Sequence, residues 1–171
     1  MPKGNYIAIP EVSSGAREYV PMAFLTPDVL CSNKLRLIPD ASLYHFGVLM
    51  SSVHMAWMRY VCGRLKSDYS YSINIVYNAF PWPVETDKAE SIKLEIEKTA
   101  KGILDARQKY AGATYAQMYG KMILFPELRK AHVANDAAVL KAYGWPTDLS
   151  EPEIVSRLFD MYAKLTNETD L

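Results

Sequence analysis

The chain has 171 residues, enough for one domain of ordinary size or two small ones. Half of the residues are hydrophobic and 22% are charged, a composition that excludes a largely disordered chain. Lys plus Arg and Asp plus Glu both number 19, and this neutral balance argues against a dedicated high-affinity nucleic-acid protein. Residues 1–66 nevertheless hold seven basic and four acidic side chains, a local excess of +3 that weakly indicates an anionic partner.

The first 83 residues are predicted to be a small mixed α/β region. Apolar or alternating segments predict strands at 5–12, 19–25, 29–38 and 70–77. Pro21 indicates that the second of these lies at a sheet edge. Two helices are expected between the last two strands. One covers 42–50 with Asp40 or Ser42 as its N-cap, and the other runs from Ser51 or Ser52 to near Gly63.

The composition changes after Pro83, and residues 84–171 are predicted to be all helical. A long amphipathic helix comes first, with Asp87 and Glu90 in capping-box spacing. Its apolar stripe consists of Ile92, Ile96, Ile103 and Tyr110. Further helices are expected over 114–120, over 126–144 with Pro first and Gly last, and over 150–168 with Ser150 as cap. The expected class is therefore α+β, with a small mixed α/β region at 1–83 followed by a helical domain at 84–171.

The two cysteines, Cys31 and Cys62, are too few for a disulfide scaffold and lie in no metal-ligand spacing. We expect both to be buried free thiols in a reducing compartment. No signal peptide or transmembrane segment is expected, because charged and polar residues interrupt every long apolar stretch. These features predict a cytoplasmic protein without a membrane partner.

The sequence contains no recognisable catalytic motif. It has no glycine-rich phosphate loop, no Gly-x-Ser-x-Gly and no cluster with metal-ligand spacing. The three histidines, His45, His54 and His132, lie far apart on predicted helices, where packed or surface histidines are the commoner case. We expect no catalytic residue and no metal site in this chain.

Two polar stretches remain as candidates for binding. They supply Ser32, Asn33, Lys34 and Arg36 in the first stretch, and Arg64, Lys66, Asp68, Tyr69, Ser70, Tyr71 and Ser72 in the second. Basic side chains neutralise phosphate or donate to guanine, while hydroxyl and amide groups bond phosphate oxygens. The alternative is a polar edge strand whose tyrosines pack alternately on the core, and composition alone favours that alternative.

Several segments in the same order resemble one family, the MmeI-like restriction–modification proteins, which are adenine-specific DNA methyltransferases. The resemblance covers nearly the whole chain, through 6–21, 32–59, 61–83, 100–120 and 126–144. Its most specific parts are Tyr-Asn-x-Phe-Pro-Trp-Pro at 77–83 and Ala-His-x-x-Asn-Asp-x-Ala-Val at 131–139. The segment 119–128 departs from the family pattern, which alters a connecting loop.

The resemblance implies a parent protein whose catalytic domain binds S-adenosylmethionine and methylates adenine N6. That domain requires an Asn-Pro-Pro-aromatic loop and a glycine-rich loop, and this sequence has neither. The chain is therefore expected to be a non-catalytic C-terminal part without a cofactor of its own. The resemblance implies part of a target recognition domain at 1–83 and a helical C-terminal domain at 84–171. Its implied partners are double-stranded DNA and the methyltransferase domain of the same parent chain, which in some relatives also carries a nuclease.

The resemblance also assigns roles to individual residues. Positions after Gly-Arg-Leu vary with the recognised DNA sequence in the family, which makes Lys66 and Asp68 candidates for base reading. Lys66 would donate to guanine O6 or N7 and Asp68 would accept from cytosine N4, from one face of an extended chain. Arg17, Lys34 and Arg36 are expected to contact phosphates.

Two alternatives stay open. Lys66 and Asp68 could form an exposed ion pair of little energetic value. The whole chain could instead be a helical protein-interaction module of a related phage-defence methyltransferase.

Overall fold

The computed structural model describes residues 2–84, 89–120 and 125–169. Two small antiparallel sheets form in the front part. The first has the strand order β3 (Ala23–Leu25), β1 (Tyr6–Pro10) and β4 (Leu35–Ile38). The second has the order β2 (Val12–Ser13), β6 (Asp68–Ser70) and β5 (Gly63–Leu65). Only Glu11 separates β1 from β2, so the chain passes directly from one sheet to the other.

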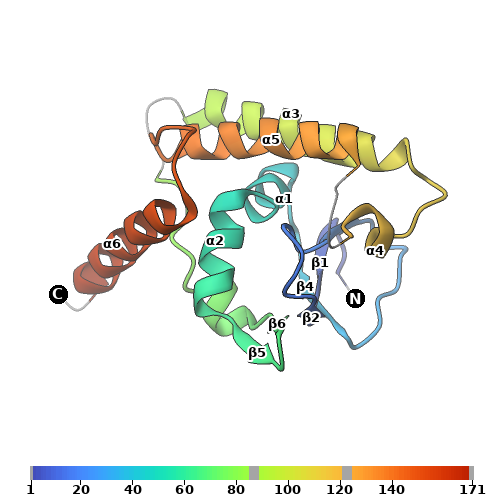
Figure 1. Cartoon of the computed structure of the whole chain (residues 1–171), viewed down its shortest axis with the longest axis horizontal. Coiled ribbons are helices and arrows are strands. Elements are labelled where there is room, and N and C mark those ends of the chain that lie inside the picture. Colours follow the sequence, from blue (N-terminus) through green and yellow to red (C-terminus); the bar gives the residue numbers. More distant parts are fainter. Residues whose placement is uncertain (1, 85–88, 121–124, 170–171) are drawn as a thin grey trace.

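Helices form the rest of the molecule. They are α1 (Leu43–Leu49), α2 (Ser52–Val61), the π-helical turn η1 (Ile73–Tyr77), α3 (Ala89–Gln108), α4 (Tyr115–Met118), α5 (Pro126–Ala142) and α6 (Glu151–Thr169). Figure 1 shows α3 and α5 side by side along one edge, with α1 beneath them and α6 at the far end from the sheets. The predicted order of mixed α/β elements followed by helices is confirmed.

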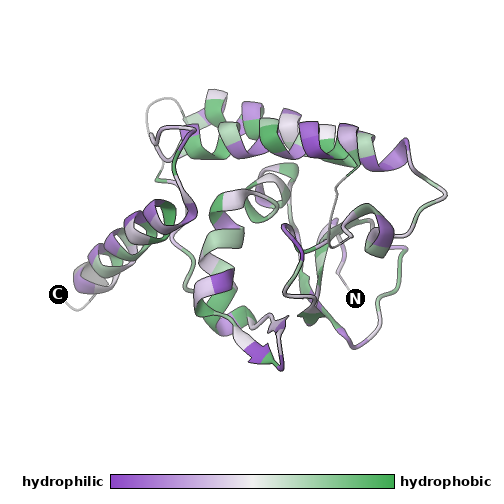
Figure 2. Cartoon of the chain, viewed as in Figure 1, coloured by the Kyte–Doolittle hydropathy of each residue, from purple (hydrophilic) through white to green (hydrophobic). Residues whose placement is uncertain are grey.

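One hydrophobic core runs through the molecule. Buried side chains from both halves belong to the same cluster, including Phe46 and Trp57 from the front part and Ile96, Leu128 and Leu158 from the helices. Figure 2 shows that α3 and α5 carry hydrophilic as well as hydrophobic residues, as helices with one buried face do. The hydrophobic core therefore joins the mixed α/β part of the chain to the helices α3, α5 and α6.

The polar residues of α5 tie the two halves together. The Asn135 amide nitrogen donates to the Gly47 carbonyl at 2.8 Å, and the Thr99 hydroxyl donates to the Asn135 carbonyl oxygen at 3.0 Å. The Asp136 carboxylate accepts from the Tyr19 hydroxyl at 2.6 Å and from the Ser52 backbone N–H at 2.7 Å. Burial raises the pKa of Asp136 to about 6, while these two bonds oppose the shift. The motif at 131–139 thus joins α5 to the front part of the chain through hydrogen bonds.

Most predicted helix ends are confirmed. The Ser51 hydroxyl accepts from the His54 N–H at 3.4 Å, so Ser51 caps α2. Ser42 is the N-cap of α1, whereas Asp40 lies before it with a φ of 52°. Pro126 opens α5, and Gly144 follows it with a φ of 69°. The capping box predicted at Asp87 lies outside the described residues.

The strand predicted over 70–77 is wrong. β6 ends at Ser70, and the following residues turn into η1, which buries Val76 completely. The Trp57 indole N–H donates to the Val76 carbonyl at 3.0 Å and holds this turn against α2. The other predicted strands are shorter than expected, and the first is divided at Glu11. The cysteines are free, as predicted, but Cys31 and Cys62 are only half-buried.

Candidate nucleic-acid interface

Lys66 lies at the tip of the β5–β6 hairpin. Leu65 pairs with Asp68, so Lys66 and Ser67 alone form the connecting loop. Lys66 is exposed and has a φ of 58°, a conformation that residues other than glycine seldom adopt. The chain reverses between Lys66 and Asp68, so the expectation that they share one face of an extended strand is wrong. The loop residues Lys66 and Ser67 are not the Asn-Gly or Asp-Gly pair that marks a two-residue hairpin turn. The sequence alone therefore did not reveal this turn.

Asp68 is half-buried beside the hairpin loop. Its Oδ1 accepts from the Gly15 backbone N–H at 3.2 Å. Within the described part of the chain, no hydrogen bond engages its Oδ2. No ion pair joins it to Lys66 among the described residues, so the alternative of an exposed Lys66–Asp68 pair finds no support in the structure.

Tyr69 and Tyr71 pack inward from β6. Tyr69 is 5% exposed, its hydroxyl donates to the Gly15 carbonyl at 3.2 Å, and the Arg64 guanidinium lies 4.3 Å from its ring centre. Tyr71 is 3% exposed and its hydroxyl lies 2.9 Å from His54 Nε2. Burial raises the pKa of Tyr71 and lowers the pKa of His54 to about 3, so both side chains are neutral at physiological pH.

This burial argues against the DNA contacts predicted for Tyr69 and Tyr71. A side chain in the hydrophobic core reaches a phosphate only if the strand that carries it leaves the sheet. Ser70 and Ser72 are half-buried and alternate with the tyrosines on the outer side. For the tyrosines, the structure therefore agrees with the packing alternative that composition favoured.

Glu11 brings the two predicted polar stretches together. Its backbone N–H donates to the Lys34 carbonyl at 3.1 Å, and its carbonyl accepts from the Tyr71 N–H at 2.9 Å. Its carboxylate pairs with the Arg36 guanidinium at 2.9 Å. Residues far apart in the chain therefore share one polar surface. A groove of about 370 Å³ lies at this junction, lined by Glu11, Arg36, Ser70, Tyr71, Ser72, Ile73 and Asn74.

The remaining predicted contacts fall into two groups. Ser32, Asn33 and Lys34 are exposed just before β4, where a duplex could reach them. Arg17 instead points at the helical half. Its Nε donates to the Tyr119 carbonyl at 3.2 Å and its Nη1 to the Ser13 hydroxyl at 3.1 Å. A phosphate contact by Arg17 would compete with these internal bonds.

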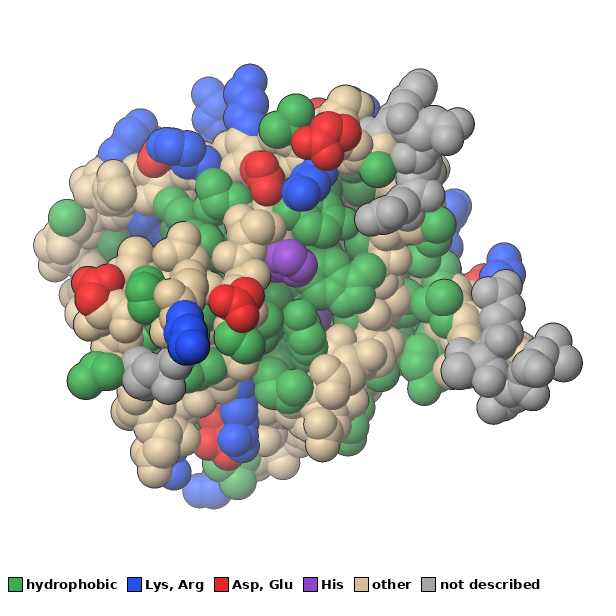
Figure 3. Space-filling view, turned by 180° about the vertical axis from the view of Figure 1, so that it is seen from behind, with side chains coloured by type: hydrophobic (Ala, Val, Ile, Leu, Met, Phe, Trp, Pro, Cys, Tyr) green, Lys and Arg blue, Asp and Glu red, His purple; other side chains and the backbone are tan. Residues whose placement is uncertain are grey.

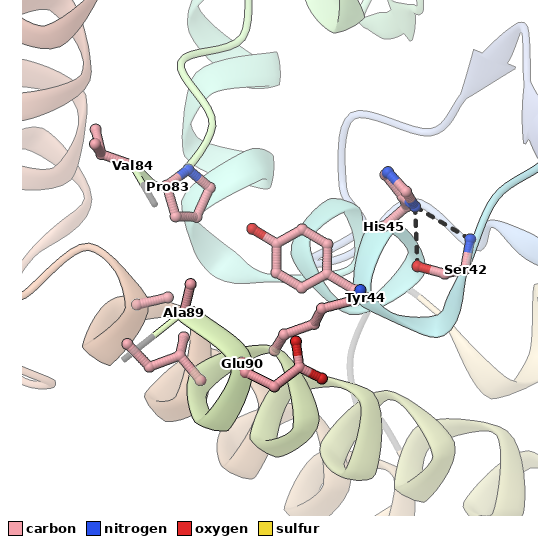
Figure 4. A pocket seen from close by; sticks show the side chains of 10 residues that line it. Ser42, Tyr44, His45, Pro83, Val84, Ala89 and Glu90 are labelled. Atoms are coloured by element: carbon pink, nitrogen blue, oxygen red, sulfur yellow. Dashed lines mark hydrogen bonds between the residues drawn. The ribbon is translucent and has the colours of Figure 1, made fainter. Parts of the chain in front are cut away.

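A cavity of about 560 Å³ lies between α1 and the start of α3. Figure 4 shows Tyr44, Pro83 and Glu90 around it, with the His45 ring turned to Ser42. His45 Nδ1 accepts from the Ser42 N–H at 3.1 Å, and burial, together with nearby Lys93, lowers the pKa of His45. The ring acts as part of a helix cap.

The described residues contain no group of three His, Cys, Asp or Glu side chains placed to hold a metal ion. None of the helices in the described ranges is long and apolar enough to cross a membrane. Figure 3 shows the face seen from behind Figure 1, where Lys and Arg are interspersed with Asp and Glu around a hydrophobic centre. The candidate surfaces for a nucleic acid are the β5–β6 hairpin and the groove at Glu11.

Comparison with known proteins decides the family. Residues 1–84 match the model of the MmeI target recognition domain, and residues 86–169 match the model of the MmeI C-terminal domain. The chain belongs to the MmeI family. This membership confirms the family that the sequence motifs indicated.

Two relatives show the extent of the match. The chain is 39% identical over 163 residues to "DNA methyltransferase A" of Bacillus subtilis (strain 168), covering 95% of this chain and 18% of that protein. It also matches the structure of the Type IIL restriction-modification enzyme MmeI in complex with DNA, with a TM-score of 0.89 and 39% identity. That match covers 97% of this chain and 22% of the MmeI chain. The chain thus spans about a fifth of the length of either relative.

Proposed function

We propose that this chain recognises a DNA sequence and positions the duplex for a methyltransferase that transfers a methyl group from S-adenosylmethionine to adenine N6. The catalytic domain would belong to the same parent restriction–modification protein, and this chain would be non-catalytic. The observation that carries the proposal is the arrangement around Glu11. There Arg36 of the 32–36 stretch lines one polar groove with Ser70, which ends β6 of the hairpin, and with Ser72, on a chain that matches a target recognition domain.

A base-reading role follows from the chemistry of the hairpin. A methyltransferase acting on a base takes that base out of the stack, so a separate element must choose the site. The exposed Lys66 side chain suits guanine O6 or N7. Asp68 Oδ2, which accepts no hydrogen bond from the described residues, suits cytosine N4. We infer that the two residues read one G·C pair from the major groove.

Changing the polarity of the hairpin pair should change one position of the recognised site. We propose Lys66→Glu combined with Asp68→Asn, because an asparagine keeps an oxygen for the Gly15 N–H. The variant should lose the preference for G·C at one base pair by about tenfold, since one good base contact contributes roughly 1–3 kcal/mol of discrimination. Selection from a pool of random duplexes measures this. As a control, Lys101→Asp with Asp105→Lys reverses an exposed ion pair on α3 and should leave the preference unchanged. An unchanged preference in the hairpin variant would rule out base reading there.

Lys34 is the clearest candidate for a phosphate contact, because it is exposed and has no ion-pair partner among the described residues. We expect Lys34→Gln to weaken binding to all duplexes alike. The slope of log affinity against log salt should fall by about one, as expected when one phosphate is no longer neutralised. Salt titrations with two unrelated duplexes measure both effects, with Lys98→Gln on the outer face of α3 as the matched control. A weakening confined to one duplex would contradict this assignment.

The helical half is proposed to support the recognition half. The bonds from the Ser52 N–H to Asp136 and from Arg17 to the Tyr119 carbonyl join the two, so we treat 1–83 as the recognition part and 84–171 as its support. We also infer a cytoplasmic protein, since a protein that modifies DNA must reach it. The alternative, a helical protein-interaction module, predicts that the chain binds no duplex DNA even at low salt.

A further inference from the structure

Gly15 contacts the β5–β6 hairpin at three points. Its N–H donates to Asp68 Oδ1 at 3.2 Å, and its carbonyl accepts from the Tyr69 hydroxyl at 3.2 Å. A Cβ atom at this position would lie 2.2 Å from the Ser67 carbonyl oxygen, closer than any side chain tolerates. The loop after β2 therefore lies against the hairpin backbone, and only glycine permits this approach.

The hairpin needs such support from its neighbours. Its strands are three residues each, and Gly63–Ser67 is exposed throughout. A two-stranded hairpin of this size is at best marginally stable on its own. The positive φ of Lys66 adds strain that the surrounding structure must enforce. The contacts of Gly15 supply this constraint directly next to the tip.

We propose that Gly15 is a positioning residue for DNA reading: through Ser67, Asp68 and Tyr69 it fixes where the hairpin tip presents Lys66 to the duplex. The inference rests on the proposed function. It gives Asp68 two simultaneous roles, in which Oδ1 holds the loop and Oδ2 faces the DNA. Recognition of a base edge requires its reading groups to be held within about 0.5 Å, which an unsupported tip does not provide.

Gly15→Ala tests the proposal in the full 171-residue chain. The added methyl group should push the loop away from Ser67, speed amide hydrogen exchange in the hairpin, and reduce discrimination between duplexes by about tenfold, because Lys66 would no longer be held against its base. Amide exchange in α3 and α5, which pack on each other and on α1, should not change. Gly63→Ala is the matched control in the same hairpin, because its Cβ would lie 3.7 Å from the nearest atom, an ordinary contact. It should behave as the wild type does in both measurements.

Two variants at Asp68 separate positioning from reading. Asp68→Asn keeps an oxygen for the Gly15 N–H, so hairpin exchange should stay slow while the base preference changes. Asp68→Ala removes both functions, so exchange should rise and discrimination should fall.

The outcomes separate the possible failures. If Gly15→Ala discriminates among duplexes as well as the wild type, the positioning role is overturned while the proposed function stands. If the wild type itself binds no duplex at low salt, the proposed function fails, and this inference fails with it.

Discussion

Trp57→Ala should lower the free energy of unfolding by about 3–5 kcal/mol, the usual cost of removing a large buried aromatic side chain. Trp57 is 2% exposed and packs against η1 and α6. Its indole N–H bonds the Val76 carbonyl, and its ring lies 5.3 Å from that of Phe159 and 5.9 Å from that of Tyr162. Its removal would therefore leave a cavity and remove contacts that hold η1 and α6 against α2.

Trp57→Phe is the matched control for this change. It keeps an aromatic ring in the core but removes the N–H that holds Val76, so it should cost about 1–2 kcal/mol. Denaturant unfolding followed by far-ultraviolet circular dichroism measures both values. Amide exchange should show α6 opening before the rest of the chain in Trp57→Ala. Equal stability of the two variants would show that the ring contacts contribute little and would contradict the packing described above.

Gly47→Val should destabilise the chain by about 3 kcal/mol, combining overpacking with a disturbed hydrogen bond. A Cβ atom at Gly47 would lie 2.6 Å from Ile96 Cγ2 and 3.1 Å from both Ala100 Cβ and Asn135 Oδ1. The substitution would force α1 away from α3 and stretch the bond from the Asn135 amide to the Gly47 carbonyl. Because these contacts join the two halves, the recognition half should loosen as well.

Gly102→Ala provides the opposite case on α3. A Cβ atom there would meet nothing within 4 Å, so the variant should gain roughly 0.5–1 kcal/mol from the better helix propensity of alanine. Thermal unfolding of both glycine variants in one buffer makes the comparison. A Gly47→Val variant as stable as the wild type would mean that α1 and α3 are packed less closely than the structure shows.

Short-range signals in the sequence located most helices correctly. A cap such as Ser51, a proline at the start of α5 and a glycine after its end act within one or two turns, so the sequence alone reveals them. The prediction of a strand at 70–77 is wrong because the conformation of this segment depends on tertiary contacts. Alternating Tyr and Ser side chains do fit a strand, but the bond from Trp57 and the burial of Val76 favour a helical turn after Ser72.

The candidate site was predicted only in part. The residue types of the two polar stretches were visible in the sequence, and the family resemblance singled out Lys66 and Asp68. The two stretches meet at Glu11 because backbone hydrogen bonds join this residue to Lys34 and to Tyr71. No local sequence pattern specifies such long-range pairs. The sequence did not reveal the proposed role of Gly15 either, because a glycine in a loop can be required for several structural reasons. Only the closeness of Gly15 to the Ser67 carbonyl oxygen distinguishes among them.

The structure also limits how the hairpin can vary. If Asp68 both holds the Gly15 loop and reads a base, as proposed, a substitution there changes the reading group and its support together. Lys66 has no such second contact among the described residues and is therefore the simpler position to alter. Changes of DNA preference should be cleanest when position 66 varies and position 68 retains a side-chain oxygen.

One selection experiment decides whether this chain reads DNA through the β5–β6 hairpin. The wild type and Lys66→Ala are each incubated with a pool of random duplexes at low salt, and the bound duplexes are sequenced. We expect the wild type to enrich a G·C pair at one position, and Lys66→Ala to bind the pool without this enrichment. The same enriched sequences for both proteins, or no duplex bound by the wild type, would show that the hairpin does not read DNA.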